Sequence, residues 1–322
     1  MKQIETVLVV GAGTMGHGFA QLFAQNDLSV RLVDISPELL EKAKGWISDN
    51  LHFMVEIGEL PKDRVEPIIG HIEVTTDLER AIEGVDFVLE AVVEDLKVKQ
   101  DVFRATDAKA PPDVVLATNT SAIEIDEISA VTRNPQRVIG SHWFNPPQIV
   151  PAVEVIPSST TSQETLYKTM NFLKSIGKVP TIIKSTPGFV ANRIQFAMAA
   201  EAWAIAEEGI ASPEDIDQIV KTSFGFRLGS YGPFEIADMA GLDTYYHIFE
   251  YLYEKLNKEI FVTPKMLREL FEKGCYGVKS NRGLYEYEPG ASERLKRERN
   301  KKLYARLRAY RAEEEAAQKG KK

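Results

Sequence analysis

A glycine-rich turn near the N-terminus constrains the fold more than any other feature of the chain. The apolar, β-branched segment Glu5–Val10 predicts a buried strand, and the G-x-G-x-x-G pattern of Gly11–Gly16 follows it directly. Apolar residues then recur at helical spacing over Phe19–Asn26, and a second strand, Leu28–Val33, ends at Asp34. Strand, turn, helix and strand within about 30 residues predict a βαβ unit with parallel strands and a right-handed crossover.

The glycine turn has the chemistry of a dinucleotide site. Gly11 permits a tight turn, Gly13 lets the backbone approach a pyrophosphate, and Gly16 allows the helix to pack closely, while the helix N-terminus offers free N–H groups. Asp34 would accept hydrogen bonds from the adenosine ribose and repel a 2′-phosphate, which favours NAD over NADP; FAD is the main rival. The candidate cofactor-binding residues of the loop are Gly11, Gly13, Thr14, Met15 and Gly16.

The rest of the chain separates into a strand-rich part and a helical part. Further strand patterns occupy 71–74, 87–92, 114–118, 138–142, 152–156 and 179–183, mostly with helical patterns between them. They predict an α/β fold with a doubly wound parallel sheet. Beyond Pro187 strand patterns nearly vanish, which predicts an all-α domain. We therefore expect domains at 1–186 and 187–290, and a charged C-terminal helix at 291–322.

Charge and composition exclude several classes of protein. The 322 residues carry a net charge of −8, but the last 32 carry +7, so the remaining body is strongly acidic and unsuited to nucleic acid. In the tail, Leu295, Leu303, Leu307 and Tyr310 lie near one helical stripe, which predicts packing on the body or on a partner subunit. No apolar run is long enough for a membrane span, no signal peptide is expected, and the single cysteine, Cys275, favours a reducing, cytoplasmic location.

One of the five histidines has the setting of a catalytic base. None has the spacing of a metal site, so no bound metal is expected, and there is no G-x-S-x-G elbow. His142 ends an apolar strand at the carboxyl side of the predicted sheet, where ligands of such folds bind. Glu154 lies 12 residues further on, in an otherwise apolar run where an unpaired carboxylate would be costly. It belongs either to an exposed strand face or beside His142, holding the imidazole in one tautomer.

Several motifs together resemble the 3-hydroxyacyl-CoA dehydrogenase family, in order and at the expected separations from residue 1 to about 288. The matching segments are Gly11–Gly16 with Asp34, Glu90–Lys99, Thr118–Ser121, His142 to Asn145-Pro146 with Glu154, and Pro187–Arg193. The resemblance implies a Rossmann-type NAD domain, a helical C-terminal domain that forms most of a homodimer interface, and a role of the kind found in fatty acid metabolism.

The resemblance also implies roles for individual residues. His142 takes the hydroxyl proton while hydride leaves C3 for the nicotinamide, and Glu154 orients the ring. Ser121 and Asn192 resemble the family's polar pair at the reacting oxygen, so both are also candidates for substrate binding. The positions that match dinucleotide contacts are Glu94, Lys99, Asn119, Ser121, Asn145 and Lys279.

Two departures from the family pattern leave the substrate open between an L-3-hydroxyacyl-CoA of the 3-hydroxybutyryl type and a small acid without CoA. The segment 50–59 has no lysine and two glutamates where CoA-using members usually carry a lysine at the CoA nucleotide. The turn Asn145–Pro151 looks more like that of carnitine, gulonate and pyridine-ring dehydrogenases, and Arg227 would suit a substrate carboxylate. A non-enzymatic, crystallin-like NAD-binding protein is the alternative from another class.

Overall fold

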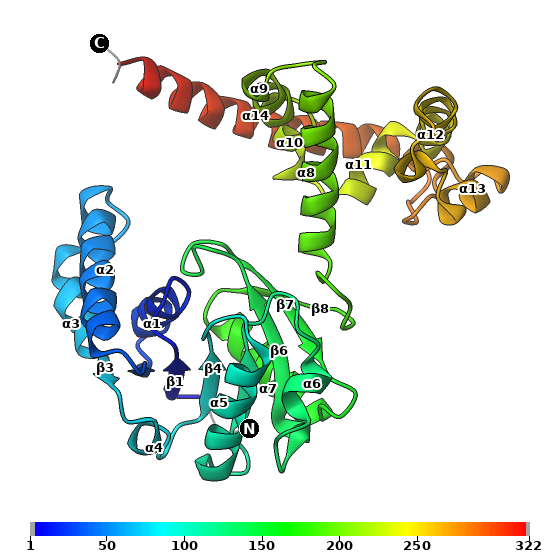
Figure 1. Cartoon of the computed structure of the whole chain (residues 1–322). Helices are drawn as coiled ribbons and strands as arrows, with labels where there is room; N and C mark the ends of the chain where they lie inside the picture. The colour runs from blue at the N-terminus through cyan, green and yellow to red at the C-terminus, as the bar shows by residue number, and fades with distance from the viewer. Residues whose placement is uncertain (1–3, 320–322) are drawn as a thin grey trace. The chain divides into compact units, whose positions relative to one another are not determined.

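The computed structural model describes residues 4–319, which form two compact units, one ending at Ala199 and one beginning at Ala200 (Figure 1). The last strand ends at Ile182, near the predicted domain boundary at residue 186. The division between the units lies further along, inside helix α8 (Ala191–Glu207). The beginning of α8 stays with the first unit because two amides there are hydrogen-bonded to Glu154 of the sheet. Gly320–Lys322 of the expected tail lie outside the described residues.

The first unit is built on one eight-stranded sheet. Its strands lie in the order β3-β2-β1-β4-β5-β6-β7-β8, and all neighbours are parallel except β6 and β7. The predicted doubly wound α/β fold is thereby confirmed. The strands are β1 (Thr6–Val10), β2 (Ser29–Val33), β3 (Ile72–Thr75), β4 (Phe87–Glu90), β5 (Val115–Thr118), β6 (Val138–Trp143), β7 (Ala152–Pro157) and β8 (Val179–Ile182).

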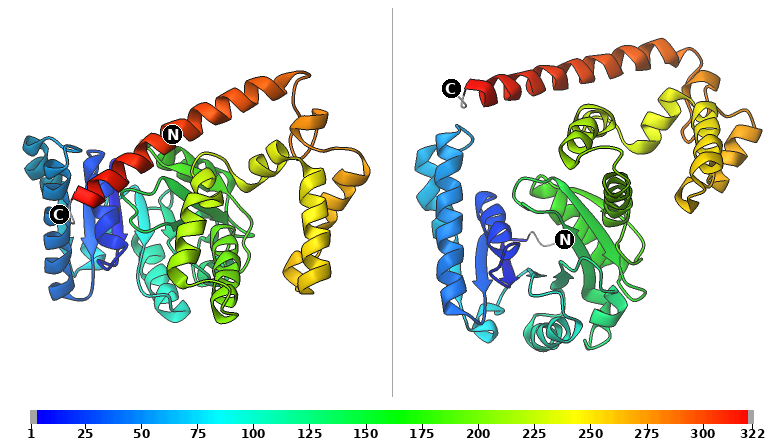
Figure 2. Two further views of the ribbon diagram at one scale, coloured as in Figure 1. Left: turned by 90° about the horizontal axis from the view of Figure 1, so that it is seen from above. Right: turned by 45° about the horizontal axis from the view of Figure 1, so that its top comes forward.

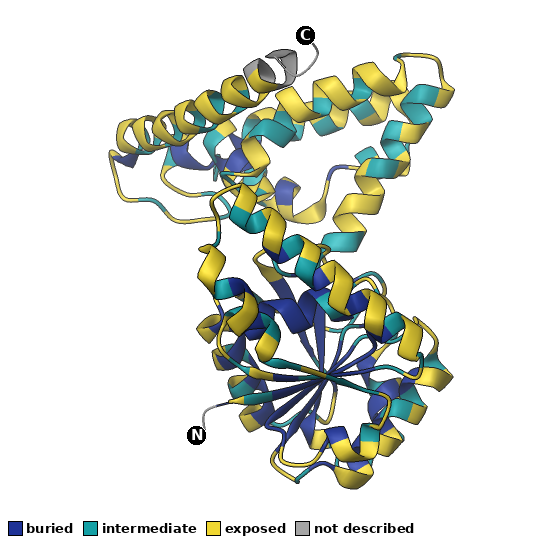
Figure 3. Ribbon diagram, turned by 90° about the vertical axis from the view of Figure 1, so that its left-hand side faces the viewer, coloured by how far each residue is buried: buried dark blue, intermediate teal, exposed yellow. Residues whose placement is uncertain are grey.

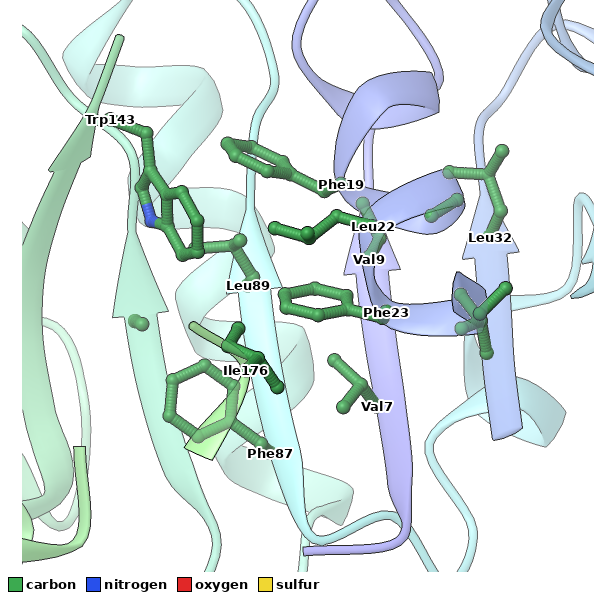
Figure 4. Packing of buried hydrophobic residues seen from close by; sticks show 14 of the residues in the cluster. Val7, Val9, Phe19, Leu22, Phe23, Leu32, Phe87, Leu89, Trp143 and Ile176 are labelled. Carbon is green, nitrogen blue, oxygen red and sulfur yellow. The ribbon is translucent and has the colours of Figure 1, made fainter. Parts of the chain in front are cut away.

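Helices cover both faces of this sheet because both faces are apolar. Val7 and Val9 of β1 belong to one core cluster, and Leu8 and Val10 to another, as the two-residue period of a strand requires. Figure 4 shows the first cluster, with aromatic side chains from α1 against the strands. Its helices are α1 (Gly16–Gln25), α2 (Pro37–Glu56), α3 (Val65–Gly70) and α7 (Gln163–Ser175). The second cluster takes in α4 (Leu78–Ala81), α5 (Leu96–Lys109) and α6 (Ile125–Ser129).

Local capping fixes where the helices of this unit begin. Ser36 accepts a hydrogen bond from the amide of Leu39 at 3.1 Å, and Pro37 occupies the first helical position of α2, where its missing N–H costs nothing. Asp95 caps α5 and Ser162 caps α7 in the same way. Two short 3₁₀ turns, η1 (Lys62–Arg64) and η2 (Pro135–Arg137), complete the unit.

The second unit is helical, as predicted. After α8 it contains α9 (Pro213–Thr222), α10 (Phe224–Leu228), α11 (Pro233–Ala240), α12 (Leu242–Leu256), η3 (Glu259–Phe261), α13 (Lys265–Glu272), η4 (Val278–Ser280) and α14 (Ala291–Lys319). Its core is small, around Ala237, Leu242 and Leu267. None of the described residues of α8, α9 and α10 is buried, whereas β4, β5 and β6 consist entirely of buried residues, and Figure 3 shows the buried residues concentrated in the sheet.

The C-terminal tail forms one long helix, α14 (Figure 2), whose side chains contact α10 and Tyr231 of the same unit. Within the stripe predicted from the sequence, Tyr310 meets Phe226 of α10 edge-on, with ring centroids 6.4 Å apart. The Arg306 guanidinium lies 5.7 Å from the centre of the Phe226 ring, and the Lys302 ammonium 4.6 Å from that of Tyr231. Among the described helices, none is both long and apolar enough to cross a membrane.

Candidate active site

The carboxyl ends of five parallel strands meet at one edge of the sheet. The glycine turn follows β1, Asp34 follows β2, and Glu90 ends β4. Thr118 ends β5, and His142 lies at the end of β6, which is parallel to β5. The candidate site residues that the sequence analysis names within the first 142 residues therefore lie at this edge of the sheet.

The glycine turn has the close contacts that its pattern predicts. Gly11 has φ = +106°, and a Cβ atom there would lie 2.6 Å from the carbonyl oxygen of Ala91. A Cβ on Gly16 would lie 1.7 Å from the carbonyl oxygen of Gly11. The start of the helix can therefore approach the turn this closely only with glycine at position 16. A Cβ on Gly13, by contrast, would meet open space, which leaves this part of the backbone accessible to a ligand.

The loop also has the donors that a pyrophosphate requires. Within the described part of the chain, the amides of Gly13, Thr14 and Met15 have no recorded acceptor, and they lie at the N-terminus of α1. Asp34 holds the turn from the next strand: one carboxylate oxygen accepts the amide of Ala12 at 2.8 Å, and the other accepts that of Ser36 at 3.0 Å. The negative charge of Asp34 would repel a phosphate on the 2′-oxygen of the ribose, which NADP has and NAD lacks. The loop thus fits NAD.

A buried ion-pair network lies beside the turn, between β4 and α5. The Lys99 ammonium is fully buried, 2.8 Å from Glu90 Oε1 and 3.3 Å from Glu94 Oε2. Glu90 also accepts the hydroxyl of Thr118 at 2.6 Å and the amide of Val92 at 2.7 Å. Lys99 is a fixed structural element of this network, because without its ammonium the buried Glu90 carboxylate would have no compensating charge.

Glu94 organises the turn after β5. Its Oε1 accepts the hydroxyl of Thr120 at 2.5 Å and the amides of Ser121 and Ala122 at 2.8 and 3.1 Å. Partial burial opposes ionisation of Glu94, but the Thr120 hydrogen bond and the charge of Lys99 outweigh it, and the pKa of this carboxyl lies below its usual value. Glu94 therefore fixes the backbone that carries Ser121.

His142 and Glu154 are brought together by strand pairing. The two residues are direct partners in the antiparallel ladder of β6 and β7, and His142 Nδ1 lies 2.8 Å from Glu154 Oε2. Both residues are buried, so the exposed-face alternative for Glu154 is wrong. Because a carboxylate accepts hydrogen bonds, this contact favours the tautomer with the proton on Nδ1 and leaves the lone pair of the neutral ring on Nε2.

Two aromatic rings and two amides complete the surroundings of this pair. The rings of Phe144 and Phe189 lie 4.9 and 5.4 Å from the imidazole, centre to centre. Glu154 Oε1, the oxygen that does not contact His142, accepts the amides of Val190 at 3.1 Å and Ala191 at 2.9 Å, at the start of α8. These amides stabilise the ionised carboxylate, as a helix N-terminus does.

The remaining candidates of the first unit lie on segments next to these groups. Asn119 follows β5 and accepts the amide of Trp143, the residue after His142, at 2.9 Å. Asn145 follows β6 and precedes a cis peptide bond to Pro146. Ser121 is exposed on the turn that Glu94 holds, and Asn192 lies in the first turn of α8, directly after the amides bound by Glu154.

Two candidates belong to the second unit. Lys279 lies in η4, and its ammonium is 2.8 Å from a carboxylate oxygen of Asp243. Arg227 is exposed near the end of α10, and its guanidinium has no recorded polar partner within the described residues.

Sequence reasoning missed two groups that shape the site. Glu90 begins the segment Glu90–Lys99 that resembles the family, but the sequence analysis assigns it no role. A glutamate that ends an apolar strand, nine residues before a lysine, is the only local signal of the buried pair. Lys178 is the second: it is buried, and its ammonium donates to the carbonyls of Pro147 and Val150 at 2.6 and 2.9 Å, which holds the turn after β6. Burial lowers the pKa of Lys178 below its usual value.

Comparison with known families accounts for most of the chain. Residues 6–186 match the 3-hydroxyacyl-CoA dehydrogenase NAD binding domain, and residues 188–287 match the 3-hydroxyacyl-CoA dehydrogenase C-terminal domain. A probable 3-hydroxybutyryl-CoA dehydrogenase of Bacillus subtilis is 38% identical over 90% of this chain and 100% of its own length. A 5-formyl-3-hydroxy-2-methylpyridine 4-carboxylate 5-dehydrogenase of Mesorhizobium japonicum is 35% identical over 94% of this chain and 97% of its own length.

Solved structures agree with these matches. A 3-hydroxyacyl-CoA dehydrogenase from Archaeoglobus fulgidus has a TM-score of 0.78 at 35% identity, covering 95% of this chain and 99% of that protein. The chain belongs to the 3-hydroxyacyl-CoA dehydrogenase family and is an NAD-dependent oxidoreductase that acts on CH–OH groups.

Proposed function

We propose that the protein interconverts an L-3-hydroxyacyl-CoA of the 3-hydroxybutyryl type and the corresponding 3-oxoacyl-CoA. The observation that carries this proposal is the 2.8 Å contact between His142 and Glu154, at the same sheet edge as the glycine turn. A neutral imidazole braced by a carboxylate is the general base that oxidation of a secondary alcohol requires. Relatives of similar length named 3-hydroxybutyryl-CoA dehydrogenase support the substrate class.

The chain's own residues handle the proton. His142 Nε2 accepts the hydroxyl proton of the substrate, and in the reverse direction it returns this proton to the forming alkoxide. Glu154 stabilises the imidazolium that forms on proton uptake. When bound, NAD supplies the acceptor for the hydride from C3. Ser121 and Asn192 act as the polar pair at the reacting oxygen, and their hydrogen bonds strengthen as negative charge develops there.

We propose that NAD is held mainly by the glycine turn and Asp34. The amides at the start of α1 bind the pyrophosphate, and Asp34 binds the adenosine ribose. Further contacts come from Glu94, Asn119, Ser121 and Asn145, which lie in the same unit as the glycine turn. For Lys99, whose ammonium is buried between two carboxylates, the contribution is to fix Glu94.

A second candidate is the same chemistry on a small acid without CoA, such as a carnitine, gulonate or pyridine derivative. Two observations favour it. The last part of α2 and the turn after it have no lysine and expose Glu56 and Glu59, which would repel the phosphates of CoA. The match to the pyridine 4-carboxylate dehydrogenase also covers 94% of this chain, against 87–90% for the butyryl-CoA enzymes.

A comparison of substrates separates the two candidates. NADH oxidation is followed at 340 nm with acetoacetyl-CoA, free acetoacetate and dehydrocarnitine under one set of conditions. We expect the largest kcat/KM for acetoacetyl-CoA. Equal or larger values for a free acid would overturn the thioester proposal and leave the reaction type intact. No turnover of any of these compounds, or of other 3-hydroxy and 3-oxo compounds, despite tight NAD binding would favour a non-enzymatic role.

We further propose that the protein is a cytoplasmic homodimer held together by its helical unit. The single cysteine suits a reducing compartment. Large apolar side chains lie exposed on the helices of one chain, among them Trp203 of α8 and Ile219 of α9. Exposed apolar surface of this kind marks an interface. Sedimentation of the purified protein at about twice the 36.1 kDa chain mass would support the dimer.

A further inference from the structure

The turn that leads into α8 has an unusual backbone. Gly188 has φ = +72° and Phe189 has φ = +51°, two consecutive residues in the left-handed region. Glycine adopts this conformation freely, but a bulky aromatic residue does so only where its surroundings enforce it. Phe189 is 1% exposed, its amide donates to the carbonyl of Thr186 at 3.0 Å, and its ring belongs to the second core cluster of the first unit.

This backbone directs the ring of Phe189 against the imidazole of His142. The two ring centres are 5.4 Å apart with an interplanar angle of 51°, and Phe144 lies at 4.9 Å and 60°. An imidazole in contact with two aromatic rings and hydrogen-bonded through Nδ1 has little freedom to rotate. The direction of its Nε2 is thereby fixed.

The next two residues of the same turn act on Glu154. The amides of Val190 and Ala191 both donate to Oε1, while Oε2 contacts His142. Within the described residues, His142 is the one titratable side chain with a recorded contact to Glu154. One four-residue turn therefore holds both members of the pair, the imidazole by packing and the carboxylate by backbone hydrogen bonds.

We propose that Phe189 is a positioning residue for the reaction, and that its left-handed backbone lets one turn orient His142 and Glu154 together. The inference rests on the proposed role of His142 as the base. Phe189 needs no contact with substrate or cofactor: it acts by keeping Nε2 in one direction before the substrate arrives, which matters because small misplacements of a catalytic group are costly.

Phe189→Leu tests this role, with Phe103→Leu as its matched control. Both phenylalanines are 1% exposed and belong to the same core cluster, but no contact of Phe103 with His142 is recorded. We expect kcat to fall about 10- to 100-fold in Phe189→Leu with the dissociation constant of NAD within about twofold of the original. Phe103→Leu should lose similar thermal stability and keep kcat within about twofold. Equal kcat losses in the two variants would overturn the proposal.

A spectroscopic measurement keeps the test independent of substrate. In protein labelled with ¹⁵N-histidine, the Nδ1 proton of His142 is assigned by its loss in His142→Ala. We expect this resonance to shift or broaden in Phe189→Leu and to stay in place in Phe103→Leu. An unchanged resonance in Phe189→Leu would contradict the positioning role even if no substrate is turned over, whereas absent turnover in the unmodified protein would count only against the proposed function.

The contribution of the backbone hydrogen bond from Ala191 to Glu154 is tested by comparing Ala191→Pro with Ala191→Gly. Proline fits the first position of a helix but lacks the N–H that Glu154 accepts, whereas glycine keeps it. Without this donor Glu154 Oε1 keeps only the amide of Val190, so the carboxylate is held by one backbone hydrogen bond instead of two. We expect the Nδ1 proton resonance of His142 to shift or broaden in Ala191→Pro and to stay in place in Ala191→Gly. An unchanged resonance in Ala191→Pro would show that the amide of Ala191 does not take part.

Discussion

The two units of this chain differ in how far their apolar side chains are buried. In the first unit the sheet is covered on both faces, and large side chains such as Phe87 are almost fully buried. In the second, the described residues of α9 and α10 include no buried one, and Trp203, in the part of α8 that belongs to this unit, is 71% exposed. The first unit thus buries most of its large apolar side chains in its own core, whereas the second has a small core and leaves many of them exposed.

The largest effect is expected on kcat, from a substitution of the proposed base in the first unit. His142→Ala removes the proposed base, and we expect kcat to fall at least about 10³-fold while NAD affinity stays nearly unchanged. Steady-state kinetics and NAD titration measure the two quantities. His71→Ala, which changes a histidine that ends α3 and has no recorded side-chain contact with the site, serves as the control. Comparable activity in His142→Ala would remove the residue from the mechanism.

The next prediction tests the exposed surface of the second unit. Trp203→Glu places a charge on the face that we propose to be an interface, so the protein should sediment as a monomer of about 36 kDa and unfold at a lower temperature. Ile35→Glu makes the same kind of change on an exposed residue of the first unit and should have neither effect. If Trp203→Glu still sediments as a dimer, this face is not the interface.

A smaller effect is expected at the end of β2. Asp34→Ala removes the proposed ribose contact and the support of the glycine turn, and NAD should bind about 10- to 100-fold more weakly, a loss of about 1.4 to 2.8 kcal/mol. Discrimination against NADP should decrease at the same time, because the repelling charge is gone. Fluorescence titration with both dinucleotides measures this. Asp49→Ala, on the exposed side of α2, should change neither affinity.

The smallest prediction concerns acid stability. Because the folded state lowers the pKa of Glu94 below 4.5, its ionised form stabilises the fold at pH values above 4.5, and this contribution is lost as the pH falls through the lower folded-state value. Glu94→Gln should flatten this dependence by no more than about 1 kcal/mol, since the side chain is partly exposed. Urea unfolding between pH 3 and 7 measures it, with Glu56→Gln as the exposed control. A slope equal to that of the unmodified protein would rule out this contribution.

The sequence by itself determined the parts of the protein that follow from local patterns. Short runs of apolar and β-branched residues located all eight strands within a few residues, because a strand covered on both faces is apolar at nearly every position. The spacing of the glycines and the place of Asp34 after the second strand predicted the cofactor loop. The partnership of His142 and Glu154 was also accessible, since a carboxylate in a buried strand needs a partner.

Only the tertiary structure decided which distant groups share the interior. It buried Lys99 between Glu90 and Glu94, turned Phe189 onto His142, and joined the start of α8 to Glu154. No periodic pattern in the sequence indicates these contacts. They depend on how strands, turns and helices that are far apart in the chain pack together, and on the free-energy cost of leaving a buried charge or amide without a partner.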